Sequence, residues 1–252
     1  MTPPKHDPFK NPTIAEALCE IHFIPHQGQF WAEDWSGAVA NRVRGRFPKV
    51  EKREIKQFQA EFGPNGLKVA EPSAVIPRSI YRSDQTGTLM QLSPGLLTVN
   101  EIAPYRGWDS FQADIKFAWE ALAEVAQINA INRIGLRYIN RLPRKDPDEL
   151  LSEWLAKSPF IPEHLLGTSS RFISRIESGF NGSGKLIVTV AETVENTERP
   201  IIFDIDTITE KEATVGWSVV EKVIDDLHES VWSVFSGAIG PKLRKVLDKG
   251  QP

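Results

Sequence analysis

Three arginines recur along one short segment of the chain with a spacing that could bind anions. The segment is Arg133-Ile134-Gly135-Leu136-Arg137-Tyr138-Ile139-Asn140-Arg141. Alternation of its side chains predicts a strand that has apolar residues on one face and Arg133, Arg137 and Arg141 on the other. At about 3.3 Å per residue, these guanidinium groups span roughly 26 Å. Such a row could form the floor of a site for phosphate or nucleic acid, because guanidinium groups pair with phosphate oxygens in bidentate geometry.

The same arginines could instead pair with carboxylates on neighbouring strands. Glu20 lies on a predicted first strand, and Asp204 and Asp206 alternate with apolar residues on a late strand. Cross-strand ion pairs of this kind contribute under about 1 kcal/mol each. Because this acidic complement is present, we favour a ladder of ion pairs over an open anion site. The residues of the binding hypothesis are therefore Arg133, Arg137, Arg141, Glu20, Asp204 and Asp206.

The two aspartates also raise the question of a metal. Two carboxylates that share one face of a strand can hold Mg²⁺ or divide acid and base roles between them. We favour pairing with arginines or exposure to solvent. His22 and His26 are four residues apart, but Pro25 and Gly28 interrupt the helix that would bring them to one metal-binding face. The sequence therefore predicts no metal site and no cofactor.

Two further signals indicate structure more than chemistry. Gly182-Ser183-Gly184-Lys185 resembles part of a phosphate-binding loop, but Leu186 and a predicted strand follow where Ser or Thr and a helix are needed. Cys19 shares a predicted strand face with Ile21 and Phe23, which favours a buried and inert thiol. No complete nucleophile or triad motif is present, so we assign no catalytic residue and leave open whether the chain is an enzyme.

The periodicity of apolar residues predicts the elements that would position these groups. Predicted strands cover residues 15–23, 50–62, 78–84, 88–92, 96–102, 131–142, 170–180, 185–193 and 200–208. Predicted helices cover residues 35–47, 108–125, 148–154 and 217–238, where apolar residues recur every three or four positions. Both halves of the chain therefore follow the order strand, helix, antiparallel strands, helix.

This order predicts an α+β fold. We expect tandem strand–helix–antiparallel strands–helix units that form a curved antiparallel sheet with the helices packed on one face. Residues 1–12 are predicted to be a flexible N-terminal arm, residues 13–129 the first α+β half and residues 130–252 the second. The two halves make one compact domain by pseudo-duplication. The duplication depends on element order alone, because no residue-level repeat is visible.

Composition excludes several classes of protein. The 252 residues are 40% hydrophobic and 25% charged, which is typical of a globular protein. The net charge of −3 argues against binding nucleic acid or anionic membranes through bulk charge. A single cysteine excludes an intrachain disulfide. The chain has no apolar run near the roughly 20 residues that cross a bilayer and no signal-peptide pattern, so we expect a cytoplasmic protein without a membrane partner.

Several blocks of the sequence resemble one uncharacterised prokaryotic family. The blocks are IAEALCEIHF at residues 14–23, VNEIAPYRGW at residues 99–108, RIGLRYINR at residues 133–141, Phe203-Asp204-Ile205-Asp206, and Leu227-His228 with Phe235 downstream. The family is known chiefly as "sporadically distributed". This resemblance implies no reaction, cofactor or catalytic residue. The patchy distribution implies cargo of mobile islands, such as defence or toxin–antitoxin modules.

These observations lead to a first functional hypothesis and an alternative. The first is a non-enzymatic binding or interaction protein with a protein partner, a second copy of the chain included. Trp31, Trp35, Trp154 and Trp232 are candidate anchors for that partner, with core packing as the competing interpretation. The alternative is a protein that acts on nucleotides or nucleic acid, with an arginine-lined sheet face and the Asp204–Asp206 pair holding a divalent metal.

Overall fold

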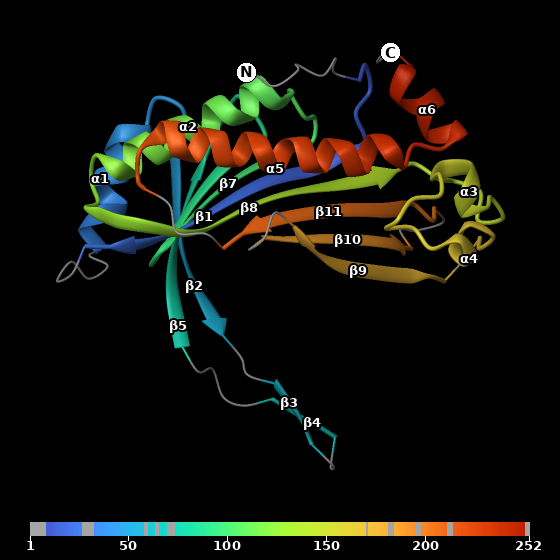
Figure 1. Ribbon diagram of the computed structural model, residues 1–252. Coiled ribbons are helices and arrows are strands. Elements are labelled where there is room, and N and C mark those ends of the chain that lie inside the picture. Colours follow the sequence, from blue (N-terminus) through green and yellow to red (C-terminus); the bar gives the residue numbers. More distant parts are fainter. Residues whose placement is uncertain are drawn as a thin grey trace.

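One open, wholly antiparallel sheet of nine strands forms the frame of the molecule (Figure 1). The computed structural model describes residues 9–26, 33–57, 60–63, 66–69, 74–169, 171–180, 184–194, 198–210 and 214–249. The strand order is β2-β5-β6-β7-β1-β8-β11-β10-β9. The strands are β1 (Ile14–Pro25), β2 (Lys49–Gln57), β5 (Ala74–Arg82), β6 (Thr88–Ser93), β7 (Leu96–Ile102), β8 (Ile128–Leu142), β9 (Ile173–Phe180), β10 (Gly184–Glu192) and β11 (Ile201–Thr209).

Helices cover one face of this sheet, as the sequence predicts. Figure 1 shows α1 (Glu33–Val43), α2 (Trp108–Ala123) and the long α5 (Trp217–Gly237) on the same side. The short helices α3 (Leu151–Trp154), α4 (Glu163–Leu166) and α6 (Pro241–Asp248) gather at one end. The α+β prediction and the antiparallel sheet are therefore confirmed.

Alternation along the strands places the core between the sheet and the helices. On β1 the buried residues are Ala17, Cys19, Ile21 and Phe23, and the residues between them are only partly buried. On β8 the buried series includes Ile134, Leu136 and Tyr138. The helices contribute apolar residues at spacings of three and four, among them Phe111, Ile115 and Leu122 of α2 and Ile224, Leu227 and Val231 of α5. The apolar faces of the strands, with a period of two residues, thus pack against the apolar faces of the helices, with a period of 3.6 residues, in one core.

The first half departs from the predicted elements at its edge. The strand predicted over residues 50–62 is two strands, β2 and β3 (Ala60–Gly63), and β3 pairs with β4 (Gly66–Val69) in a separate small sheet. Strand β5 begins at Ala74, earlier than predicted, and includes Pro77. The pairing of β5 with β6 spans only Ser79–Arg82, so at Pro77 only β2 lies alongside. A proline is tolerated there because it needs no second ladder partner.

The second half departs from the prediction at two helices. The helix predicted over residues 148–154 begins only at Leu151, because Asp146 accepts a hydrogen bond from the Asp148 N–H at 2.9 Å and closes a turn instead. Helix α6 was not predicted, because the last predicted helix ends at residue 238 and no element was assigned after Gly240-Pro241. Proline at a first helical position is equally a start signal, and here it begins α6.

Part of the predicted N-terminal arm is packed against the body of the protein. Asn11 donates hydrogen bonds from its backbone N–H to the carbonyl of Leu247 (3.1 Å) and from its side chain to the carbonyl of Val246 (3.2 Å). Phe9 stacks on Trp232 with ring centroids 5.3 Å apart. Residues 1–8 lie outside the described part of the chain. Across the described ranges, none of the helices has the length and apolar character that crossing a bilayer requires.

Candidate functional site

The arginine side chains of β8 project from the sheet face that the helices leave open, opposite to the buried Ile134, Leu136 and Tyr138. Arg137 donates two hydrogen bonds to Asp204, from Nε to Oδ1 at 2.8 Å and from Nη2 to Oδ2 at 2.6 Å. The Arg137 side chain is 40% exposed, whereas that of Asp204 is 12% exposed. This bidentate geometry uses the guanidinium edge that a phosphate would need.

The other candidate residues are distributed along the same face. The Nη2 atom of Arg133 lies 3.9 Å from Oε2 of Glu20, and His22 lies 3.5 Å from the same oxygen. The contact with His22 lowers the pKa of Glu20 despite partial burial, and Arg133 acts in the same direction. Arg141 pairs with Glu198 at 3.4 Å, toward the far end of β8. The structure therefore brings Arg133 and Arg137 near carboxylates of β1 and β11, and Arg141 near a different acid.

Asp206 has the most perturbed carboxyl group of this set. It is opposite Arg137 in the β8–β11 register, although Arg137 bonds to Asp204 instead. Burial raises the pKa of Asp206 from 3.8 to about 6, with the negative charge of Asp204 adding to this and Arg137 opposing it. Among the described residues, no group of three or more His, Cys, Asp or Glu side chains could hold a metal ion. Asp204 and Asp206 therefore lack a third such ligand within that part of the chain.

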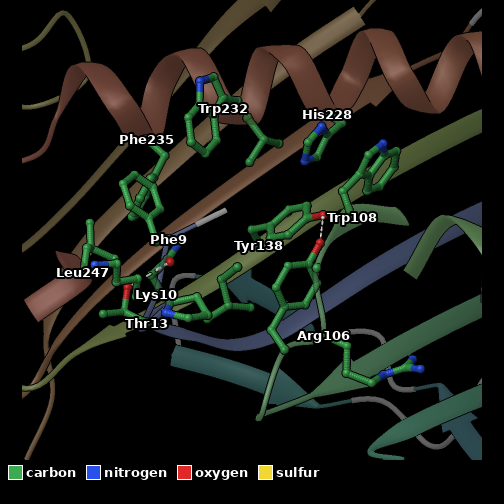
Figure 2. Close-up of a pocket in the computed structure, with 16 residues that line it drawn as sticks. Phe9, Lys10, Thr13, Arg106, Trp108, Tyr138, His228, Trp232, Phe235 and Leu247 are labelled. Atoms are coloured by element: carbon green, nitrogen blue, oxygen red, sulfur yellow. Dashed lines mark hydrogen bonds between the residues drawn. The ribbon is translucent and has the colours of Figure 1, made fainter. Parts of the chain in front are cut away.

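A pocket lies on the opposite, helix-covered side of the sheet (Figure 2). Its volume is about 310 Å³, at the lower end of the range typical of small-molecule sites. The walls come from the N-terminal segment, β1, the loop before α2, β8, α5 and α6. The lining residues are Phe9, Lys10, Pro12, Thr13, Ile14, Tyr105, Arg106, Gly107, Trp108, Tyr138, Asn140, His228, Val231, Trp232, Phe235 and Leu247.

Two tyrosine hydroxyls meet at the side of this pocket. The hydroxyls of Tyr105 and Tyr138 are 2.9 Å apart, and their rings pack edge to face with centroids separated by 5.7 Å. Burial raises the pKa of both phenols, so both carry their protons at neutral pH. Two hydroxyls that share one hydrogen bond use only one of their two protons in it. The pair therefore retains one O–H donor.

Two aromatic stacks form the wall next to α5. Trp108 and His228 lie almost parallel, with ring centroids 4.1 Å apart and an interplanar angle of 6°. Asp225 anchors this arrangement from α5 because it accepts a hydrogen bond from Gln112 at 2.7 Å and another from Trp108. Phe9, stacked on Trp232, forms the second wall. Flat ring surfaces therefore define much of the cavity, as Figure 2 shows.

The polar end of the pocket is held by hydrogen bonds within the protein. Thr13 donates from its hydroxyl to Oδ1 of Asn140 at 3.2 Å, and Asn140 donates from its amide to the carbonyl of Phe203 at 3.3 Å. These bonds connect the start of β1 to β8 and β11. Asn140 is buried, so its orientation is set by these partners.

An ionic cluster fixes the loop that carries Tyr105, Gly107 and Trp108. Arg106 donates to Oε1 of Glu101 from its backbone N–H (2.6 Å) and to Oε2 of Glu101 from Nη2 (3.1 Å). The same Nη2 donates to Asp114 of α2 at 2.5 Å, and Asp114 also accepts from Arg46 at 2.9 Å. In Figure 2 the Arg106 side chain extends away from the tyrosine pair. Arg106 therefore positions the loop that forms one wall of the pocket.

The sequence did not single out this pocket, but signals for it were present. Tyr105, Arg106 and Gly107 were assigned no role, and Tyr138 was expected only on the apolar face of its strand, where it lies. Nine of the sixteen lining residues lie in segments 14–23, 99–108 and 133–141 or at positions 228 and 235: Ile14, Tyr105, Arg106, Gly107, Trp108, Tyr138, Asn140, His228 and Phe235. Segments far apart in the sequence thus converge on one cavity.

The candidate anchors and the cysteine have different outcomes. Trp35 and Trp154 are buried in the core, so core packing is the correct interpretation for these two. Trp232 lines the pocket, and Trp31 lies outside the described residues. Cys19 is buried as predicted, and burial raises the pKa of its thiol well above the ordinary value.

The glycine-rich segment at residues 181–184 falls partly outside the described part of the chain. Its flanking strands β9 and β10 pair in antiparallel register, with Gly184 opposite Phe180. Lys185 lies in strand β10, so no helix follows the lysine as a phosphate-binding loop requires.

The chain matches none of the protein-family models against which it was scanned, and a search of the curated proteins likewise found no match.

Proposed function

We propose that this chain is a non-enzymatic binding protein whose ligand site is the aromatic pocket beside α5. The observation that carries the proposal is the cavity itself: about 310 Å³, walled by stacked rings and containing a tyrosine pair with an O–H to donate. Pockets that bind small ligands combine apolar walls with a few convergent polar groups in this way.

The chemistry of the lining favours binding over catalysis. Among the described residues that line the pocket there is no Asp, Glu, Cys or Ser, and His228 is stacked on Trp108. The two tyrosines hold their protons because burial raises their pKa, which makes them poor bases at neutral pH. Thr13 is the remaining hydroxyl, and its proton is donated to Asn140. These groups can orient a ligand through hydrogen bonds.

A filled-pocket variant tests the proposal. Val231 lies on the pocket wall, so Val231→Phe should occupy part of the cavity, whereas Val223→Phe adds the same volume elsewhere on α5. Bicyclic aromatic fragments should bind the wild type and Val223→Phe with a Kd of about 1 mM or tighter, the value expected for some 13 heavy atoms at about 0.3 kcal/mol each. Saturation-transfer NMR measures this. Binding that survives unchanged in Val231→Phe would place the ligand elsewhere and refute the proposal.

The nucleotide alternative relies on the open sheet face and has weaker support. Arg137 is already in bidentate contact with Asp204, so a phosphate would have to displace a carboxylate that is mostly buried. Asp206 ionises only above a pH of about 6, which weakens it as a metal ligand in mildly acidic solution. Stabilisation of the wild type by a nucleotide or an oligonucleotide, lost in Arg137→Ala, would favour this alternative.

We also propose that the two halves arose by duplication. Moving outward from the central β1–β8 pair, the first half gives the order β1-β7-β6-β5-β2 and the second gives β8-β11-β10-β9, so the two orders match over four strands and β2 is an additional edge strand of the first half. Along the chain, the last strand of each half is followed by a long helix: α2 follows β7, and α5 follows β11. Superposition of residues 15–128 on residues 131–248 is the test. A fit limited to one helix and one hairpin would count against duplication.

The remaining parts of the proposal derive from the sequence. They are membership of the "sporadically distributed" prokaryotic family, a cytoplasmic location, a mobile-island context and a protein partner, a second copy of the chain included. Light scattering after size-exclusion chromatography tests self-association, and a strictly monomeric protein would leave a different protein as the partner to be sought.

A further inference from the structure

We infer that the pocket binds an amphipathic monoanion: a carboxylate attached to a flat, apolar ring system. This inference rests on the proposed function, because it names the class of ligand for the same cavity. Three features of the described residues lead to it, namely the charge around the pocket, its unused hydrogen-bond donors and the shape of its walls.

The pocket lining includes two cations, Lys10 and Arg106, and carboxylates neutralise only Arg106. Lys10 is exposed at the pocket and makes no ion pair with any residue that the structure describes. Arg106 also lines the pocket, but Glu101 and Asp114 already neutralise it. The described lining contains no acidic side chain, and Asp109, in the first turn of α2, is not part of it. A ligand anion beside Lys10 would therefore meet one cation, with no acidic side chain in the described lining to oppose it.

The donors around the cavity suit an oxyanion. The tyrosine pair retains one O–H, and it lies beside the beginning of α2. Gly107 is the N-cap of that helix, adopts a φ of 100°, and provides no side chain to cap the first turn. N–H groups at a helix start carry partial positive charge that favours anions, and Asp109 in the first turn offsets part of it. The tyrosine hydroxyl is a second donor beside α2, whereas Lys10 lies nearer to Phe9, Thr13 and Leu247 (Figure 2).

The walls select the rest of the ligand. Parallel or near-parallel rings, Trp108 on His228 and Phe9 on Trp232, leave flat surfaces that a planar ring system can contact over its whole face. A single unpaired lysine compensates one negative charge, so a dianion such as a phosphate monoester would bring a second charge into apolar surroundings without a partner. The chemistry therefore favours a monocarboxylate.

A matched pair of probes separates this inference from the proposed function. The probes are 2-naphthoate and its neutral amide, 2-naphthamide, titrated into the full chain at pH 7 by saturation-transfer NMR. We expect the carboxylate to bind at least about tenfold more tightly than the amide, which corresponds to about 1.4 kcal/mol. In Lys10→Gln this preference should fall below about threefold, with the affinity for the amide unchanged. Lys245→Gln, an exposed charge on α6 outside the pocket, is the control and should keep the preference.

Each other outcome has a definite meaning. Equal binding of both probes, or a preference for the amide, overturns the inference and leaves the proposed binding pocket intact. A preference for the carboxylate that persists in Lys10→Gln also overturns it, because the anion would then be recognised elsewhere. Failure of both probes to bind the wild type contradicts the inference and the proposed function together.

Discussion

Replacing Arg106 by alanine should destabilise the protein through two carboxylates that it leaves behind. The Glu101 side chain is fully buried (0% exposed) and that of Asp114 is 6% exposed, whereas Arg106 is 33% exposed. In Arg106→Ala, Glu101 keeps the backbone N–H of residue 106 but loses both guanidinium contacts. Asp114 keeps Arg46 and Thr88. The uncompensated charge is therefore that of Glu101.

The expected loss follows from this inventory. Removing one partner of a buried ion pair typically costs about 3–5 kcal/mol, and partial exposure of Arg106 places this case near the lower end, at about 3 kcal/mol. Urea unfolding followed by tryptophan fluorescence should show the midpoint falling by about 1 M. Arg46→Ala is the control: it removes a 42% exposed arginine from the same Asp114 and should cost about 1 kcal/mol or less.

A second substitution tests the cause directly. Glu101→Gln in the Arg106→Ala background removes the uncompensated charge, so the double variant should recover at least about 1 kcal/mol of the loss. The Arg106→Ala variant should also bind 2-naphthoate less well than the wild type. Arg106 holds the loop from Tyr105 to Trp108 in place, and this loop forms one wall of the pocket. A loss no larger than that of Arg46→Ala, or no recovery in the double variant, would refute this reasoning.

Three further predictions concern the sheet. Arg137→Ala should lower the free energy of unfolding by about 2 kcal/mol without ligand, between the values for exposed and buried pairs, and an unchanged urea midpoint would contradict the ion-pair assignment. In the folded protein the pKa of Asp206 is raised from 3.8 to about 6. The ionised Asp206 carboxylate therefore lowers the free energy of unfolding above pH 6, and this destabilisation disappears as the carboxylate becomes protonated toward pH 4. Asp206→Asn should therefore stabilise by about 1–2 kcal/mol at pH 7 and by much less at pH 4, and equal gains in urea unfolding at both pH values would exclude this cause. Cys19 should react with a thiol reagent far more slowly in native than in denatured protein, and equal rates would show that its strand face is misassigned.

Alternation in the sequence was sufficient to predict the faces that the arginines and apolar residues of segment 133–141 in β8 occupy. Tyr138 points toward the helices and Arg137 away from them, because the period of two follows from strand geometry alone. It could not predict which acid pairs with Arg137. That depends on register, and the β1–β8 pairing shifts at three places, including between His22 and Phe23. The partner is Asp204 on β11, which pairs with β8 on the side opposite to β1 and its Glu20.

The pocket depends on contacts that have no local sequence signal. Thr13 bonds to Asn140, Tyr105 to Tyr138, and Phe9 stacks on Trp232, so each wall joins segments that are distant in the chain. Periodicity describes neighbours within one element and does not indicate which elements will lie together. Seven of the sixteen lining residues fall within segments 14–23, 99–108 and 133–141, which lie far apart in the sequence.

Strand β8 connects the two surfaces and allows their roles to be separated. Arg137 and Tyr138 are adjacent, yet one is part of an ion pair on the open face and the other lines the pocket on the covered face. The bond from Arg137 to Asp204 holds β8 against β11, which keeps the floor under Tyr138 and Asn140 in place. Arg137→Ala should therefore lower stability while the preference for carboxylate over amide persists. Lys10→Gln should remove the preference at constant stability, because Lys10 is exposed and bears no ion pair within the described residues. If each substitution instead changed both properties, the two faces would be coupled, and the open face would belong to the binding site.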